Sequence, residues 1–198
     1  MNIRRKRASY TQIIAMGFLL LIAAGTALLV LPISSRSGRW TSLPDALFTA
    51  VSAACVTGLV VVDTFTHWSW FGRGVLLVLI QVGGLGFMTI ATWFFLLMRR
   101  RIGLRTRETL SESINTTQIG GILQLTRQII SGTACVEGIG AVLLSIRFCP
   151  QFGFARGIAY GVFHAVSAFC NAGFDLMGCF APYGSLTPYA QDPLVILT

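Results

Sequence analysis

The 198-residue chain is 54% hydrophobic and only 11% charged, and it contains 21 glycines. Charged residues make up about a quarter of a usual soluble domain, and a soluble domain of this size could not bury so much apolar surface. Disordered chains are poor in apolar residues, so the composition excludes that class too and indicates an integral membrane protein.

The formal net charge of +8 is concentrated beside apolar runs. Ten of the 15 Lys and Arg residues lie in two clusters, at residues 4–7 and between residues 99 and 127. Basic residues that flank apolar segments orient spans in a bilayer. Neither cluster is interleaved with the aromatic residues typical of nucleic-acid binding, so we expect no nucleic-acid partner. The arginines from 99 to 107 are predicted to set topology, with acidic lipid head groups or a regulatory subunit as alternative contacts.

The first elements are a basic cytoplasmic N-terminus, residues 1–11, and an apolar run from Ile13 to Ile33. This run can cross about 30 Å of hydrocarbon and is longer than a signal peptide, so it predicts a retained first span. The apolar stretch Leu43–Ala54 covers roughly 18 Å as a helix, which is about half of the bilayer core. It predicts a re-entrant helix from the outer face, and Pro44 fits its first turn.

A second long apolar run, Gly74–Met98, ends at three consecutive arginines, 99–101, which indicate a cytoplasmic stop. Inside it, residues 83–86 read Gly-Gly-Leu-Gly. This run lacks the spacing of a dinucleotide-binding loop, and predicts close packing of helix backbones or a helix bend instead. With the preceding span and re-entrant helix it completes a first unit, residues 12–98.

Residues 99–126 are predicted to form a cytoplasmic linker of amphipathic helix and loop, and residues 127–198 a second, incomplete unit. Its span, Gln128–Phe148, contains Glu137, and an ionisable group inside a span is a functional candidate. A hydrogen bond to an adjacent helix and a role near an ion path or regulator both remain open. The stretch Gly157–Phe169 predicts a second re-entrant helix, giving about three spans and two re-entrant helices in an all-α membrane fold.

The two short apolar stretches form an internal repeat. FTAVSAACVTGLV at residues 48–60 and FHAVSAFCNAGFD at residues 163–175 share seven of 13 positions at a fixed offset of 115. The repeated unit is therefore a span, a re-entrant helix, a glycine-containing loop and a second span, and such repeats set the architecture of a chain.

The repeated loops, residues 55–59 and 170–174, predict a selectivity filter. Non-helical backbone at membrane depth is tolerated where it lines a water-filled path, and its carbonyls can replace the water shell of an ion. Gly58 and Gly173 are expected to adopt conformations that only glycine reaches cheaply. Neither loop supplies a ring of carboxylates, which favours a weakly hydrated monovalent cation over calcium.

The remaining polar residues point to no chemistry. The five cysteines lack metal-binding spacing and are predicted to be buried small hydrophobes without a disulfide or metal role. His67 and His164 are too few and too far apart for a metal centre. Asp63, outside the first loop, either attracts cations or caps a turn. No nucleophile, paired carboxylate or phosphate loop is present, so we predict no enzyme activity and no bound cofactor.

Three stretches resemble the Trk/Ktr/HKT superfamily of potassium transporters: ALFTAVSAACVTGLVVVDT (46–64), LIQVGGLGFMTIAT (79–92) and HAVSAFCNAGFDL (164–176). The resemblance extends over nearly the whole chain from about residue 10. Ktr-type membrane subunits fit best, because the first repeat starts almost at the N-terminus and residues 102–115 are also similar to the Ktr pattern.

This resemblance implies the pore subunit of a potassium uptake system in the bacterial inner membrane, with potassium as the solute and sodium as a candidate symported ion. It implies a homodimer on a cytoplasmic ring of nucleotide-binding Ktr/Trk-type regulatory subunits. The ion-coordinating backbone, carried over by position, falls at Val56, Thr57, Gly58, Asn171, Ala172 and Gly173.

The resemblance implies four repeats, whereas this sequence contains two, and residues 192–197 look like the start of a further span. We therefore expect an N-terminal fragment of a longer transporter. A two-repeat channel in which two chains supply four filter strands, and a non-conducting membrane remnant or scaffold, are the alternatives.

Overall fold

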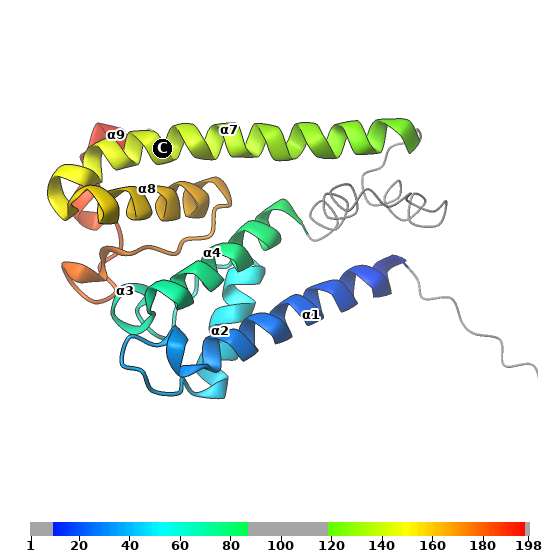
Figure 1. Cartoon of the computed structure of the whole chain (residues 1–198), viewed down its shortest axis with the longest axis horizontal. Coiled ribbons are helices and arrows are strands. Elements are labelled where there is room, and N and C mark those ends of the chain that lie inside the picture. The colour runs from blue at the N-terminus through cyan, green and yellow to red at the C-terminus, as the bar shows by residue number, and fades with distance from the viewer. Residues whose placement is uncertain (1–9, 87–118, 197–198) are drawn as a thin grey trace, which may run out of the picture.

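The computed structural model describes residues 10–86 and 119–196, and these two ranges contain helices and loops but no β-strand (Figure 1). Residues 1–9, 87–118 and 197–198 lie outside the described residues, as do the predicted basic N-terminus and most of the predicted linker. The predicted all-helical class is confirmed for the part of the chain that the structure describes.

Helix α1 (Tyr10–Val30) contains most of the predicted first span but ends three residues early. The cause is Pro32, because a proline disfavours helical backbone at the residue before it. Leu31 accordingly takes an extended conformation, with φ −61° and ψ 142°, and a short 3₁₀ helix, η1 (Pro32–Ser34), follows.

Helix α2 (Leu43–Ala54) has the predicted boundaries. The side chain of Ser42 accepts the backbone N–H of Asp45, and the proline lies in the first turn, where its missing N–H costs nothing. The short helix α3 (Thr64–His67) follows.

Helix α4 (Trp70–Leu85) starts before the predicted run because the Ser69 side chain caps it by accepting the N–H of Gly72. It ends at Gly86, whose φ of +80° is incompatible with a continuing helix. The apolar run 74–98 is therefore not one uninterrupted helix, and residues 87–98 lie outside the described ranges.

Helix α7 (Ile119–Phe152) contains the predicted third span and begins within the predicted linker. Its segment Thr126–Phe152 is the one helix in the described residues that is long and apolar enough to cross a membrane. The apolar parts of the other predicted spans, Ile14–Val30 and Trp70–Leu85, are shorter. Three spans therefore remain a prediction.

Helix α8 (Phe154–Phe169) begins three residues before the predicted stretch and runs back along α7 (Figure 1). Gly153, with φ +84°, forms the turn between them. Gly157 allows the close approach, since a methyl group there would lie 2.5 Å from Cys149 Cα. The chain then continues through η2 (Met177–Cys179), η3 (Thr187–Tyr189) and the short helix α9 (Pro193–Ile196), which falls on the predicted start of a further span.

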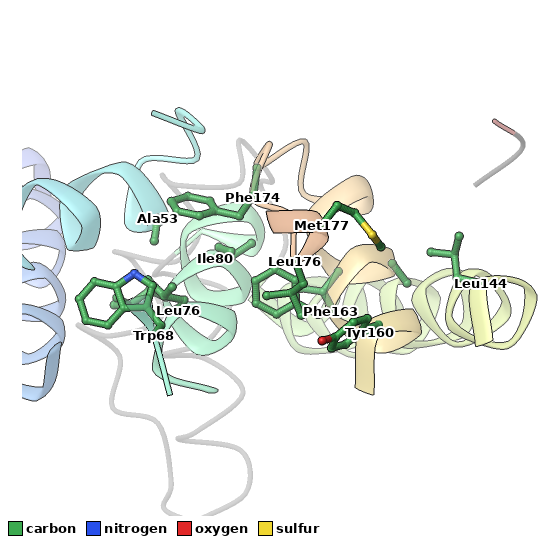
Figure 2. Close-up of a cluster of buried hydrophobic side chains, with 14 of the residues drawn as sticks. Ala53, Trp68, Leu76, Ile80, Leu144, Tyr160, Phe163, Phe174, Leu176 and Met177 are labelled. Carbon is green, nitrogen blue, oxygen red and sulfur yellow. The ribbon is translucent and has the colours of Figure 1, made fainter. Parts of the chain in front are cut away.

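One hydrophobic core joins the two halves of the sequence (Figure 2). Trp68, fully buried, and Leu76 and Ile80 of α4 represent the first half. Phe174 and Leu176, from the loop after α8, and Met177, the first residue of η2, lie in the same cluster. Val56 of the first repeated loop packs against this core and Ala172 of the second lies within it, so one core contacts both loops.

Candidate functional site

The repeated loops lie against each other at their glycines. A methyl group on Gly58 would lie 2.8 Å from the carbonyl oxygen of Ala172 and 3.3 Å from Gly173 Cα. A methyl group on Gly173 would likewise lie 3.3 Å from Gly58 Cα. Two segments 115 residues apart in the sequence thus meet backbone to backbone, with no side chain between them.

The two loops leave their helices with the same backbone hydrogen bonds. In the first loop, the N–H groups of residues 55, 56 and 57 donate to the carbonyls of residues 51, 53 and 52. In the second loop, residues 170, 171 and 172 donate to residues 166, 168 and 167, which is the same pattern at the same offset. The donor–acceptor distances lie between 2.7 and 3.3 Å. The sequence repeat is therefore also a repeat of local conformation.

In both loops, residues with positive φ alternate with a residue outside that region. Gly58 and Gly173 have φ of +72° and +71°, which confirms the special conformations predicted for them. Val56 and Asn171 also have positive φ, +56° and +54°. Asn tolerates this region and a β-branched Val does not. The strained Val56 was not predicted from the sequence, although its alignment with Asn171 in the repeat is a signal that could have indicated it.

Side chains of α8 hold the second loop. Ser167 Oγ donates to the Phe174 carbonyl at 2.6 Å, and both residues are buried. The backbone N–H of Leu176 donates to His164 Nε2 at 3.2 Å, so Nδ1 carries the proton and donates to the Tyr160 carbonyl at 2.7 Å. His164 is thus a satisfied, buried support of the loop.

The first loop lacks the counterpart of these contacts. Ser52, which aligns with Ser167, accepts the Thr57 hydroxyl at 3.0 Å. Thr49, which aligns with His164, donates to the Asp45 carbonyl within its own helix. The two loops share their backbone course but not the side chains that support it.

Helix α4 supports both loops through its glycine run. A side chain at Gly83 would collide with the backbone of Ala54, the last residue of α2. A methyl group on Gly84 would lie 2.5 Å from Cys170 Sγ, directly after α8. The close packing predicted for this run is confirmed at Gly83 and Gly84, whereas Gly86, with φ +80°, has no described atom within 4 Å of an added Cβ and is where α4 ends.

Glu137 of α7 is tied to α4. Gln81 Nε2 donates to both carboxylate oxygens, at 2.9 Å to Oε1 and 3.1 Å to Oε2. The predicted hydrogen bond to an adjacent helix is confirmed. The alternative role near an ion path or a regulator stays a prediction.

Asp63 caps a turn, as one of its two predicted roles required. It accepts the N–H of Thr66 at 2.7 Å and that of Tyr183 at 3.1 Å, and the Tyr183 hydroxyl donates to the Val61 carbonyl at 3.1 Å. Burial opposes ionisation of this carboxyl, but the backbone N–H donors outweigh it, so its pKa lies below the ordinary value. Burial raises the pKa of nearby Asp175. Asp63 therefore joins the start of α3 to the segment around Tyr183.

The predicted burial of the cysteines is wrong. All five are free, and Cys55, Cys135 and Cys179 are exposed while Cys149 and Cys170 are half-buried. Cys55 and Cys170 are the C-caps of α2 and α8, and Cys170 packs against the core while remaining only half-buried. The other histidine, His67, forms a hydrogen bond between its Nε2 and Thr41 Oγ1 at 3.1 Å.

Comparison with known proteins gives a family and several relatives. The profile of the family TrkH, described as cation transport protein, matches residues 2–198. The potassium/sodium uptake protein NtpJ of Enterococcus hirae is 48% identical over 174 residues, which are 88% of this chain and 39% of that protein. The Ktr system potassium uptake proteins B of Bacillus subtilis and Vibrio alginolyticus are 45% and 38% identical, each over 94% of this chain and 40% of their own length. The chain thus spans about two fifths of the length of these relatives.

Proposed function

Since the chain belongs to the TrkH family of cation transport proteins, which are membrane transporters and not enzymes, we propose that it forms part of a potassium uptake pore. The observation that carries this proposal is the contact between two loops of matching conformation at Gly58 and Gly173. In this proposal α2 and α8 are re-entrant pore helices, and the loops after them are two strands of a selectivity filter. The coordinating carbonyls are those of residues 56–58 and 171–173.

Backbone geometry supports carbonyl coordination. Each loop has positive φ at its first and third coordinating residue, 56 and 58 or 171 and 173. The residue between them is outside the positive-φ set. Alternating handedness turns successive carbonyls toward one side, which is what replacing the water shell of a cation requires.

Electrostatics support a cation in the same place. Helices α2 and α8 end at Ala54 and Phe169, directly before the loops. The C-terminal end of a helix carries partial negative charge, so both helix ends favour a cation at the loops. The loops, residues 55–59 and 170–174, contain no carboxylate, which suits potassium, a cation that sheds its water easily, better than calcium.

Membership of the family supports a wider arrangement as part of the same proposal. We place the protein in the bacterial inner membrane with a cytoplasmic N-terminus, residues 12–98 as one span–loop–span unit and residues 127–198 as part of a second. The relatives named as Ktr systems and as a potassium/sodium uptake protein support potassium as solute and sodium as a coupled ion. A homodimer on a cytoplasmic nucleotide-binding regulatory subunit belongs to the same proposal.

Growth at micromolar potassium in bacteria without their own potassium uptake systems tests this function. We expect Gly58→Ser and Gly173→Ser to abolish rescue or to relax selectivity against sodium. Gly38→Ser is the matched control, because Gly38 also has positive φ, +68°, but a Cβ added there would meet no described atom within 4 Å. It should keep uptake at an equal amount of membrane-inserted protein.

Two arms separate the alternatives. The 198-residue chain and a chain extended beyond residue 198 are expressed side by side. Rescue by the shorter chain would favour a two-repeat channel, and rescue by the longer chain alone would favour four repeats. If neither well-inserted chain supports growth, or if the loop serines behave like Gly38→Ser, the filter assignment is wrong and a non-conducting scaffold becomes the better interpretation.

A further inference from the structure

Three arginines from distant parts of the sequence line one pocket of about 230 Å³. Arg36 comes from the loop after η1, Arg73 from the first turn of α4 and Arg156 from the first turn of α8. Hydroxyl-bearing residues Ser35, Ser69 and Tyr160 complete its polar lining, and no carboxylate is among the described residues that line it. The pocket therefore concentrates positive charge and hydrogen-bond donors where the two halves of the chain meet.

Arg73 is the buried member of this set. It is only 5% exposed, its Nη2 donates to the Phe65 carbonyl at 2.7 Å, and its Nε has no hydrogen-bond partner among the described residues. The guanidinium lies 4.8 Å from the ring centre of Phe65 and 5.0 Å from that of Trp70. Rings on its faces leave only its edge for further hydrogen bonds.

No ion pair in the part of the chain that the structure describes neutralises Arg73. Within residues 10–86 and 119–196, the one salt bridge joins Arg147 to Asp192. Asp63 acts on Arg73 through space, but its carboxylate already accepts the amides of Thr66 and Tyr183. A buried cation without an anionic partner is costly, so the pocket lacks a negative charge that a ligand can supply.

The position of the pocket indicates where this anion comes from. Helices α4 and α8 both begin on the same side of the molecule (Figure 1), and helix N-termini favour anions. Three large apolar side chains at these helix starts are exposed, Trp70 at 54%, Phe71 at 43% and Phe154 at 78%. Exposed aromatic residues beside a polar site are typical of the head-group layer of a membrane.

We propose that this pocket, which we call the arginine pocket, binds a phosphate oxyanion, with the head group of an anionic phospholipid as its source. Arg73 supplies the buried donor, Arg36 and Arg156 close on the phosphate from two sides, and Tyr160 offers a hydroxyl. Planar guanidinium groups bind phosphate oxygens in pairs, which suits three of them around one group. The bound lipid would then fasten the start of α4 to the start of α8.

Thermal unfolding of the purified complete chain in detergent, with added phosphatidylglycerol, phosphatidylcholine or inorganic phosphate, tests the proposal. We expect phosphatidylglycerol to raise the midpoint, and Arg36→Gln or Arg156→Gln to raise the lipid concentration needed at least about tenfold, since each loses a charge-assisted hydrogen bond. Arg39→Gln is the matched control, because it removes the same charge from the same exposed loop outside the pocket lining. This assay reads binding and not transport, so its result is independent of the filter proposal.

Each outcome has a separate meaning. Stabilisation by phosphatidylglycerol that is lost in the pocket variants but kept in Arg39→Gln supports the lipid source. Equal stabilisation by inorganic phosphate, lost in the same variants, supports the phosphate site with a free anion as ligand. If Arg36→Gln and Arg156→Gln respond to every additive as the unmodified protein does, the proposal is overturned. Arg73→Gln adds a third variant, and the two exposed arginines carry the test if it does not fold.

Discussion

Replacing Ser167 by alanine isolates the side-chain support of the second loop. The substitution removes the hydroxyl that donates to the Phe174 carbonyl at 2.6 Å. Phe174 is only 2% exposed, so its carbonyl is left buried without this donor. A buried acceptor without a partner costs about 1–3 kcal/mol. We therefore expect Ser167→Ala to lower the free energy of unfolding by about 2 kcal/mol.

The repeat supplies the control at the aligned position. Ser52→Ala removes the acceptor of the Thr57 hydroxyl, but Thr57 is exposed and its hydroxyl can turn to water. The expected loss is about 0.5 kcal/mol, at the lower end of the net contribution of a hydrogen bond. The two variants delete the same hydroxyl from aligned helix positions. The difference between their losses in unfolding free energy therefore measures the contribution of the hydrogen bond to the Phe174 carbonyl.

Equilibrium unfolding in detergent micelles with a rising fraction of SDS, followed by tryptophan fluorescence, gives both values. Ser167→Thr keeps a hydroxyl and should recover most of the loss. In uptake assays, Ser167→Ala should also weaken the preference for potassium over sodium, because a carbonyl beside the proposed filter becomes free to turn. Equal losses for the two alanine variants would refute the assigned role of Ser167.

Three further outcomes are expected. In an alanine series measured by the same unfolding assay, Gly38→Ala should lose about 1–2 kcal/mol from positive φ alone, and Gly58→Ala should lose more because its methyl group also meets the Ala172 carbonyl at 2.8 Å; equal losses would argue against the loop contact. Asp63→Asn should lower the thermal midpoint at pH 7 by loosening the Tyr183 contact. Because the Asp63 pKa is depressed below 3.8 in the folded state, the advantage of the unmodified protein is present above that value and should vanish as pH falls through the lower pKa; an advantage that persists in acid would contradict this. Glu137→Gln keeps a hydrogen-bonding partner for Gln81 and should retain potassium uptake, whereas Glu137→Leu should reduce the amount of folded protein; loss of uptake in a well-folded Glu137→Gln protein would instead place the carboxylate near the ion path.

Helix boundaries were predicted best where a capping residue or a first-turn proline sets the boundary by its own local chemistry. Ser42 and Pro44 define the start of α2 through their own chemistry, and the structure has the predicted bounds. The predictions failed where an apolar run contains a backbone breaker. Pro32 ends α1 early because counting apolar residues does not register a proline clash, whereas the end of α4 at Gly86 fits the helix bend that residues 83–86 also predicted.

At the candidate site too, features with a local sequence signal were predicted and features created by packing were not. The repeat indicated Gly58 and Gly173 and their special conformations, because glycine at matching positions has a direct backbone meaning. The conformation of Val56 was missed because a β-branched residue disfavours positive φ, and only its alignment with Asn171 in the repeat could have indicated it. The arginine pocket was also beyond prediction, because residues 36, 73 and 156 become neighbours only when the two halves pack together.

The glycine run of α4 has a mechanical consequence. At residue 83 the helix backbone lies directly on the backbone of Ala54 at the end of α2, and at residue 84 it lies against the short side chain of Cys170, the residue directly after α8. Neither contact contains a long side chain that could adjust, so a tilt of α4 is passed on to the start of both loops. One helix therefore acts as a common lever for two loops, and any force that displaces it is delivered to both at the same time.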